Sequence, residues 1–247
     1  MSGHSKWATI KRAKAKTDAA RGKSFTKVIR EIAAAARIGG GDPNGNPRLR
    51  LAIDKAKSAN MPADNIKRAI DKATGGGEGA ILDEVTYEGF GPAGVAIMVE
   101  CITDNKTRTL NEMRFIFSRN GGNLGENGSV GWMFKKKGVL NFERSKANED
   151  QLMADAIDAG AEDISTEESL ITVETTPEKF EQVKNALLAK KYEPATAEIT
   201  MIPSNTIKLE GEDAHKVLKF VDVLEENDDV QKVHANFDIP DEIITAA

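Results

Sequence analysis

The first thirty residues of the chain carry its most distinctive chemistry. Nine of them are lysine or arginine, and Asp18 is the one acid among them. The nine are Lys6, Lys11, Arg12, Lys14, Lys16, Arg21, Lys23, Lys27 and Arg30. Cations that neutralise phosphates release counterions, which gives affinity for nucleic acid without any sequence being read. A solvated lysine-rich surface usually carries interleaved acids, which this run lacks. The segment predicts nucleic-acid contact, with an ordinary solvated surface as the alternative.

Trp7 adds an aromatic ring to this basic run. It could stack on an unpaired base, a contact worth roughly 1–3 kcal/mol in single-strand binders, or it could dock the segment on the helices that follow. Between Ile10 and Phe25 alanine is the one apolar residue type, so the segment buries little by itself. We expect an arm that becomes fully ordered only against a partner. A transit peptide is a rival interpretation of the basic start.

Charge is segregated along the chain. The whole sequence has 34 basic and 39 acidic residues and a net charge of −5. Residues 1–72 hold 17 basic and 6 acidic residues, whereas residues 73–247 hold 17 basic and 33 acidic ones. Such asymmetry indicates an electrostatically specialised segment and a polyanionic partner.

The composition is that of an ordinary globular protein. Hydrophobic residues make up 40% of the chain and charged residues 30%, enough apolar material to bury a core. Cys101 is the single cysteine, so no intrachain disulfide can form and a reducing compartment is expected. No apolar run approaches the roughly 18 residues of a membrane helix. We expect a cytoplasmic protein without membrane contact.

The residues that most often act as metal ligands or nucleophiles are few and scattered. His4, His215, His234 and Cys101 stand far apart, without paired-ligand spacing. His215 and His234 are expected as solvated histidines on polar faces, and Cys101 as a buried structural thiol. We therefore expect no metal, no cofactor and no enzymatic activity.

The glycine run GGNLGENGSVGW offers backbone amides that could hold an anion. It lacks the G-K-[ST] of a phosphate loop and precedes a strand pattern, so its expected role is a set of tight turns with positive φ. An enzyme acting on a small anion at residues 121–131 is the weaker alternative. The acidic pairs Glu225 with Glu226 and Asp228 with Asp229 are expected at the solvated surface.

Three amphipathic helices are expected over residues 24–75. Ser24 and Asn46 are the expected N-caps of the first two, Pro47 fits the first helical position, and the third begins at about Pro62. Glycines end the first and the third helix. These helices add a secondary basic patch, which could extend the nucleic-acid contact: Arg48, Arg50, Lys57, Lys67 and Arg68.

From residue 81 onward, apolar residues alternate with period two, which indicates strands. The segments DEVTYEGF and GVAIMVECITDN are expected as strands, followed by a helix over about 107–119 and by two strands separated by KKKG. Residues 138–202 give a βαβαβ pattern, which suits a two-layer sandwich. Its second helix is expected to be capped by Thr176, with Pro177 as the next residue. The tail supplies a strand, a helix and a last strand.

The expected fold class is α+β. A basic three-helix domain with its arm occupies residues 1–76, and two α/β domains of the ferredoxin-like, two-layer sandwich type follow. The middle domain takes residues 77–135 and 205–247, and the domain inserted in it takes residues 136–204. The periodicity is compatible with this partition. The strand, helix and strand of the tail are too few to form a sheet of their own, so we expect them to complete the sheet of the middle domain.

The choice between DNA and RNA stays open at this level. A helix-turn-helix would need a recognition helix close behind a short turn, and the glycine-rich loop before residue 47 is longer than that. A basic arm beside an acidic body suits a crowded RNA surface at least as well, since the body is repelled while the arm is attracted.

Six blocks together resemble the YebC/PmpR family, whose mitochondrial relative is a translational activator of cytochrome c oxidase subunit I. They are GHSKW, RGKSFTK, GGGDPNGNPRLR, YEGFGPAGVAIMVE, GGNLGENGSVGWMF and MIPSN, in order from Gly3 to Asn205. The resemblance covers nearly the whole chain. It implies a helical N-terminal domain and two α/β domains, the last inserted in the middle one.

The same resemblance implies a cytoplasmic, DNA-binding transcriptional regulator. The alternative is a ribosome-associated translation factor that binds ribosomal RNA and relieves stalls on proline-rich sequences. The resemblance also implies that GHSKW, with His4, and the basic positions through Arg30 are the nucleic-acid contacts. The oligomeric state stays unassigned.

Overall fold

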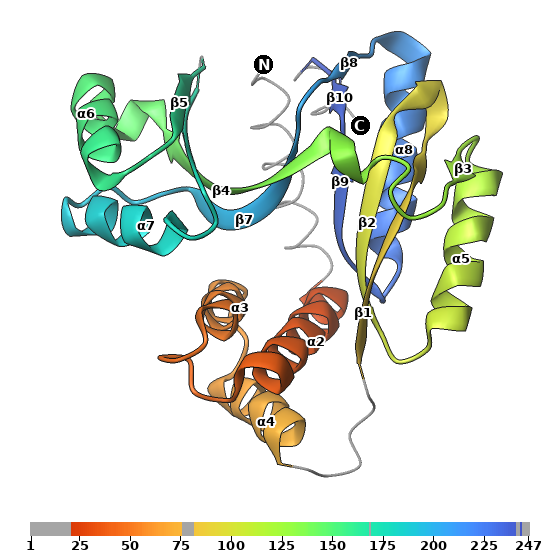
Figure 1. Ribbon diagram of the computed structural model, residues 1–247, viewed down its shortest axis with the longest axis horizontal. Coiled ribbons are helices and arrows are strands. Elements are labelled where there is room, and N and C mark those ends of the chain that lie inside the picture. The colour runs from red at the N-terminus through yellow and green to blue at the C-terminus, as the bar shows by residue number, and fades with distance from the viewer. Residues whose placement is uncertain (1–20, 76–81, 168, 241–242, 244–247) are drawn as a thin grey trace. The chain divides into compact units, whose positions relative to one another are not determined.

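The computed structural model describes residues 21–75, 82–167, 169–240 and 243, with side chains from residue 25 onward. The described chain is α+β, as expected, with a helical region at its N-terminal side followed by antiparallel sheets carrying helices (Figure 1). Its contacts divide it into two compact units. In the described part, one unit holds residues 21–131 and 211–235, and the other holds residues 132–210 and 236–240. The three domain boundaries expected from the sequence stay a prediction.

The helical region begins the first unit. It comprises α2 (Arg21–Gly39), α3 (Pro47–Ser58) and α4 (Ala63–Thr74). Its core is built from small and branched side chains, with Ile32 and Leu49 fully buried. The prediction that Ser24 caps the first helix is wrong, because α2 is already helical from Arg21.

Asn46 fixes the loop between α2 and α3. Its side-chain oxygen accepts a hydrogen bond from the backbone N–H of Leu49 at 3.1 Å, as the N-cap prediction requires. Its side-chain amide donates to the carbonyls of Ala35 and Gly40, both at 2.8 Å. A Cβ at Gly39 would lie 2.6 Å from the Asn46 amide nitrogen, so a glycine is needed where α2 ends. The buried polar side chain thereby joins two helices and the turn between them.

The first unit also contains a four-stranded antiparallel sheet. Its strands are β1 (Asp83–Phe90), β2 (Ala96–Thr103), β3 (Asn123–Leu124) and β9 (Val230–Ala235), in the order β3-β1-β2-β9. Two helices accompany the sheet, α5 (Lys106–Arg119) and α8 (Gly211–Glu226). They meet through Phe117 and Phe220, whose rings pack edge to face with centroids 5.0 Å apart.

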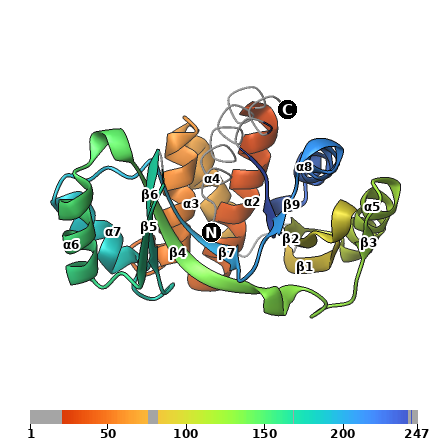
Figure 2. The same cartoon turned by 90° about the horizontal axis from the view of Figure 1, so that it is seen from above.

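Both faces of this sheet are covered. Figure 2 shows α5 and α8 on one side of β2 and β9, with α2 on the other. Alternation along β9 therefore does not separate core from solvent. The prediction of a solvated His234 is wrong, because the side chain is buried and its Nε2 lies 3.1 Å from Glu100 Oε1.

The second unit is a complete ferredoxin-like sandwich. Its elements are β4 (Phe134–Glu143), α6 (Glu149–Ala159), β5 (Asp163–Thr166), β6 (Leu170–Thr175), α7 (Phe180–Ala189) and β7 (Thr196–Pro203). The sheet is antiparallel in the order β5-β6-β4-β7, which with the βαββαβ connectivity is the ferredoxin-like pattern. The sequence pattern missed the short strand β5.

Two other expectations fail in this unit. The KKKG segment was expected to separate two strands, but Lys135, Lys136 and Lys137 lie inside the single strand β4, where they pair with β7. Thr176 was expected to cap the second helix, but α7 begins at Phe180 and Thr176 lies in the turn before it.

Short elements complete the described chain. β8 (Ile207–Lys208) and β10 (Phe237–Asp238) form a two-stranded parallel pair, and there are 3-10 turns at Pro92–Gly94, Gly131–Met133 and Arg144–Lys146. None of the helices in the described ranges has the length and apolar character that crossing a membrane requires.

Candidate nucleic-acid interface

Most of the basic arm lies outside the described residues. This holds for His4, Lys6, Trp7, Lys11, Arg12, Lys14 and Lys16. Arg21 and Lys23 are placed in α2 by their backbone, and their side chains are outside the described set. The structure therefore describes the side chains of two predicted contacts in this run, Lys27 and Arg30.

Both of these side chains bind other parts of the same unit. Lys27 Nζ donates to the carbonyl of Glu225 at 2.5 Å, at the end of α8. Burial lowers the pKa of Lys27, although the charges of Glu225 and Asp228 act in the opposite direction. Arg30 Nη1 donates to the carbonyl of Asp228 at 2.6 Å and to Asp229 Oδ1 at 2.5 Å. The two side chains fasten α2, the helix that follows the arm, to the sheet.

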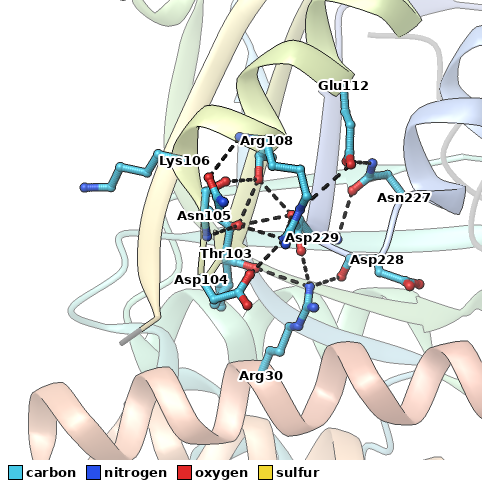
Figure 3. Close-up of polar contacts among 12 residues, drawn as sticks. Arg30, Thr103, Asp104, Asn105, Lys106, Arg108, Glu112, Asn227, Asp228 and Asp229 are labelled. Atoms are coloured by element: carbon cyan, nitrogen blue, oxygen red, sulfur yellow. Dashed lines mark hydrogen bonds and ion pairs between the residues drawn. The ribbon is translucent and has the colours of Figure 1, made fainter. Parts of the chain in front are cut away.

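Asp229 is the centre of this attachment. Together with Arg30, Thr103, Arg108 and Thr109 it forms what we term the Asp229 cluster (Figure 3). The second carboxylate oxygen accepts from Arg108 Nη2 at 2.8 Å and from the hydroxyls of Thr109 and Thr103 at 2.7 and 3.1 Å. Each oxygen thus has a charged donor, which is the condition for burying a carboxylate without a large penalty.

Electrostatics in the cluster favour the charged forms. Burial alone would raise the pKa of Asp229, but hydrogen bonds from Arg108, Thr109 and Arg30 outweigh it and hold that pKa below its usual value. The hydrogen bond to Asp229 raises the pKa of Arg108 still further above its already high value. The expectation that Asp229 is a solvated surface acid is wrong, because its side chain is only 4% exposed.

The cluster also fixes the start of α5. Asn105 caps this helix by accepting a hydrogen bond from the N–H of Arg108 at 3.0 Å. Thr103, two residues earlier, accepts from the N–H of Asn105 at 2.9 Å. β2, α5, β9 and α2 therefore meet at one polar point (Figure 3).

The secondary basic patch is only partly available to a ligand. Arg48 Nε lies 2.9 Å from Glu31 and its Nη1 lies 2.6 Å from Glu84. These two acids raise its pKa against the effect of burial, which is the largest single influence. Arg68 donates to Asn65 at 2.6 Å. Arg50 is partly buried, and its Nε has no hydrogen-bond partner among the residues that the structure describes.

Lys57 and Lys67 are exposed and lie beside one shallow hollow. The hollow has a volume of about 330 Å³ and lies between α3 and α4, with Ile53, Ile66 and Ile70 at its base. Asp71 also lines it. Of the five predicted patch residues, the structure brings these two lysines together, whereas Arg48 forms ion pairs with two acidic side chains.

The glycine-rich loop before β4 does hold an anion, and the anion is a side chain of the chain itself. The carboxylate of Glu88, in β1, accepts hydrogen bonds from the N–H groups of Gly128, Val130 and Gly131 at 2.9, 2.8 and 2.6 Å. Burial would raise the pKa of Glu88, and these three bonds together lower it. Gly128 has φ of +90°, as the tight-turn prediction requires. These three amides are therefore occupied by a carboxylate and are not available to a phosphate.

We predict that Glu88→Ala destabilises the protein by about 1–3 kcal/mol, because it leaves amide donors in the loop without an acceptor. Urea unfolding gives the free energy, and amide exchange should quicken at Gly128, Val130 and Gly131. Glu126→Ala, at an exposed position of the same loop, is the matched control and should stay within about 0.5 kcal/mol of the wild type. Equal stability of the two variants would contradict the role of Glu88.

The remaining candidate residues are Cys101 and His215. Cys101 is buried, as predicted, and burial raises the pKa of its thiol to about 12. His215 is exposed, with its Nδ1 2.8 Å from the carbonyl of Gly211. Within the described ranges, no three His, Cys, Asp or Glu side chains are grouped so that they could hold a metal ion.

Sequence reasoning missed the role of two acids. Asp229 lies in a polar, turn-rich stretch of the sequence, and Glu88 is a polar residue of a predicted strand. Their partners are distant: Arg30 is 199 residues from Asp229, and Val130 is 42 residues from Glu88. Neither pairing has a local signal. The glycines of the loop were the one available hint that a carboxylate or phosphate would be bound there.

Comparison with known proteins gives matches over nearly the whole chain. The model of the TACO1/YebC protein N-terminal domain matches residues 5–76, and the model of the TACO1/YebC second and third domain matches residues 82–237. A protein of Syntrophus aciditrophicus is 57% identical over 245 residues, 99% of this chain and 98% of its own. One of Geotalea uraniireducens is 55% identical over 242 residues, 98% of each chain. Both are named "Probable transcriptional regulatory protein".

A solved structure has the same fold. The crystal structure of a conserved hypothetical protein of Aquifex aeolicus matches with a TM-score of 0.82 and 47% sequence identity, over 92% of this chain and 93% of its own. The arrangement of helices and sheets described above is thus one that a crystal structure of a similar sequence also has.

Proposed function

Because the chain belongs to the TACO1/YebC family, we propose that it is a non-enzymatic, DNA-binding regulator of transcription that acts in the cytoplasm and binds through its basic arm. The observation that carries the proposal is the segregation of charge. Residues 1–72 hold 17 basic against 6 acidic residues, in a chain whose net charge is −5. A polyanion is attracted by the arm and repelled by the rest, which orients the protein on it.

The names of the relatives agree with this role, since they describe transcriptional regulators. The buried ionisable groups support a non-enzymatic role. Asp229 is bound by two arginines, Glu88 by three amides, and the Cys101 thiol is buried with a raised pKa. Each therefore has a structural function, which leaves the binding of nucleic acid to the exposed cations.

The proposal is tested by the salt dependence of binding to duplex DNA. If about five of the nine basic side chains contact phosphates, the slope of log affinity against log salt is about −4.5. Fluorescence anisotropy with a labelled duplex between about 0.05 and 0.2 M salt covers the range in which this slope is measurable. A slope near zero, or no binding at the lowest salt, would overturn the proposal.

A ribosome-associated translation factor is the second candidate. The observation in its favour is the acidic balance of residues 73–247, with 17 basic against 33 acidic residues. Such a body is repelled from RNA while the arm is attracted, which suits an arm inserted into ribosomal RNA. In this role the family resemblance points to the relief of stalls on proline-rich sequences.

Competition separates the two candidates. Labelled protein is bound to purified ribosomes at physiological salt and titrated with excess genomic duplex DNA. If DNA removes the protein at modest excess, the ribosome contact is electrostatic attraction alone and the transcriptional role stands. If the ribosome complex survives the DNA, ribosomal RNA is the partner and the second candidate replaces the first.

A further inference from the structure

The outer surface of α5 carries an exposed aromatic ring. Phe115 is 58% exposed, whereas Phe117, two residues later, is fully buried against Phe220. The guanidinium carbon of Arg119 lies 5.6 Å from the centre of the Phe115 ring. A single exposed apolar side chain needs no explanation by itself. Here it coincides with two further features, unpaired positive charge and an adjacent hollow.

The charge around Phe115 is positive and uncompensated. Within the described part of the chain, neither Arg114 nor Arg119 has an acidic partner. Arg108, on the same helix, contacts both Asp104 and Asp229 at 2.8 Å. The one acid of α5, Glu112, is held by other residues: it lies 3.8 Å from Arg108 and accepts a hydrogen bond from Asn227 at 2.8 Å. An anionic ligand can therefore approach this surface although the chain as a whole is acidic.

A hollow of about 410 Å³ adjoins the ring. It is lined by Arg114, Phe115, Ser118, Gly122, Asn123 and Leu124. Asn123 lies on β3, the edge strand of its sheet, and is exposed. The hollow is thus lined by an aromatic ring, a guanidinium, and the amide and hydroxyl side chains of Asn123 and Ser118. Aromatic or arginine planes with polar groups at their rim are the usual means of holding an unpaired base of RNA.

We infer that Phe115, with Arg114, Arg119 and the adjoining hollow, is a stacking site for one unpaired base of an RNA strand. The base lies against the Phe115 ring, and the arginines neutralise the phosphates on either side of it. A base within a duplex is already stacked on both faces, so a duplex cannot use the ring. The inference rests on the proposed binding of nucleic acid and names a second contact, on α5, that is separate from the basic arm.

The test compares a single-stranded oligoribonucleotide with a duplex DNA of the same sequence, using full-length protein. Phe115→Leu keeps an apolar side chain and removes the aromatic face. It should weaken binding of the single strand about 5- to 10-fold, the lower end of the range for one stacked base, and leave duplex binding unchanged. Arg119→Gln should weaken the single strand and reduce the salt slope by about 0.7. Ile157→Ala, at a residue that is 62% exposed in α6, is the matched control and should bind both as the wild type does.

A photochemical measurement gives a readout that a purely structural role would not move. Thiouridine-substituted RNA is cross-linked to the protein, and the tryptic peptides are mapped. A cross-link in residues 115–119, which trypsin releases as one peptide, is expected in the wild type and should disappear in Phe115→Leu. Single-strand affinity and cross-links that are the same in both proteins would overturn the stacking site. Loss of the arm's contribution, in contrast, would abolish duplex and single-strand binding together, so a failure of the proposed function is recognised separately.

Discussion

Replacing Lys11, Arg12, Lys14 and Lys16 together by glutamate should weaken binding of duplex DNA by about 10³-fold at 0.15 M salt. The size follows from counterion release. Each phosphate contact contributes a slope of about −0.9, so that at this salt four contacts account for about three decades of affinity. The slope itself should fall from about −4.5 to about −1. Anisotropy titrations of wild type and variant at four salt concentrations give both quantities.

The control is a variant with the same change in net charge at exposed positions away from the arm. Lys135, Lys136, Lys208 and Lys219 are exposed, and their replacement by glutamate alters the total charge by the same amount. Because long-range repulsion is screened over about 10 Å at 0.1 M salt, this control should lose far less affinity. If the two variants weaken binding equally, the arm is not the binding element and net charge alone governs the affinity.

Asp229→Ala should destabilise the protein by about 3–5 kcal/mol. Removing one partner of a buried ion pair leaves the other charge without compensation, which is the costly case. Here Arg30 and the Thr103 and Thr109 hydroxyls would lose their shared acceptor, and Arg108 would keep its contacts with Thr103, Asp104 and Glu112 but lose the buried carboxylate. Urea unfolding measures the loss. Asp228→Ala removes an exposed neighbouring carboxylate and should change stability by less than about 0.5 kcal/mol.

Asp229 should also account for part of the protein's loss of folding stability in acid. The pKa of Asp229 is lower in the folded protein than its ordinary value, so the folded state favours the charged form. Its contribution is fully present above the unfolded pKa of about 3.9 and is lost as the pH falls through the folded pKa. As the pH falls below about 4, the free energy of unfolding of the wild type should therefore decrease more steeply than that of Asp229→Ala. Parallel curves would show that Asp229 is not held in its charged form by the fold.

The elements with local signals were predictable from the sequence. The cap at Asn46, with Pro47 behind it, places the start of α3 correctly, because a side-chain acceptor and a proline act on their own turn. The period-two alternation of apolar residues predicts β1 and β2 at the positions where the structure has them. The glycines after α2 end that helix, and Gly40 has φ of +85°.

Features that depend on distant partners were not predictable. Lys135 to Lys137 read as a turn, yet they pair with residues 200–202 of β7 and stay in the strand. His234 reads as a solvent-facing residue, but its side chain is buried and contacts Glu100, which is 134 residues away in the sequence. In the candidate site, Arg30 reads as one more phosphate contact of the arm, and only the fold brings Asp229 to within 2.5 Å of it. The periodicity of an element can be recognised in a single sequence, but the distant segments that pack against that element cannot.

The pairing of β2 with β9 has a consequence for the order of events during synthesis. Glu100 and His234, whose side chains are in contact across these strands, are 134 residues apart, whereas the sandwich of β4 to β7 is built from a continuous segment between them. A growing chain therefore completes the sandwich first, since nearby segments meet sooner and at lower entropic cost. Until Val230–Ala235 is made, β2 has an open edge, and an unpaired edge strand can pair with another chain. The nascent protein is thus most prone to misassembly in the interval between completing the inner sandwich and releasing its last strands.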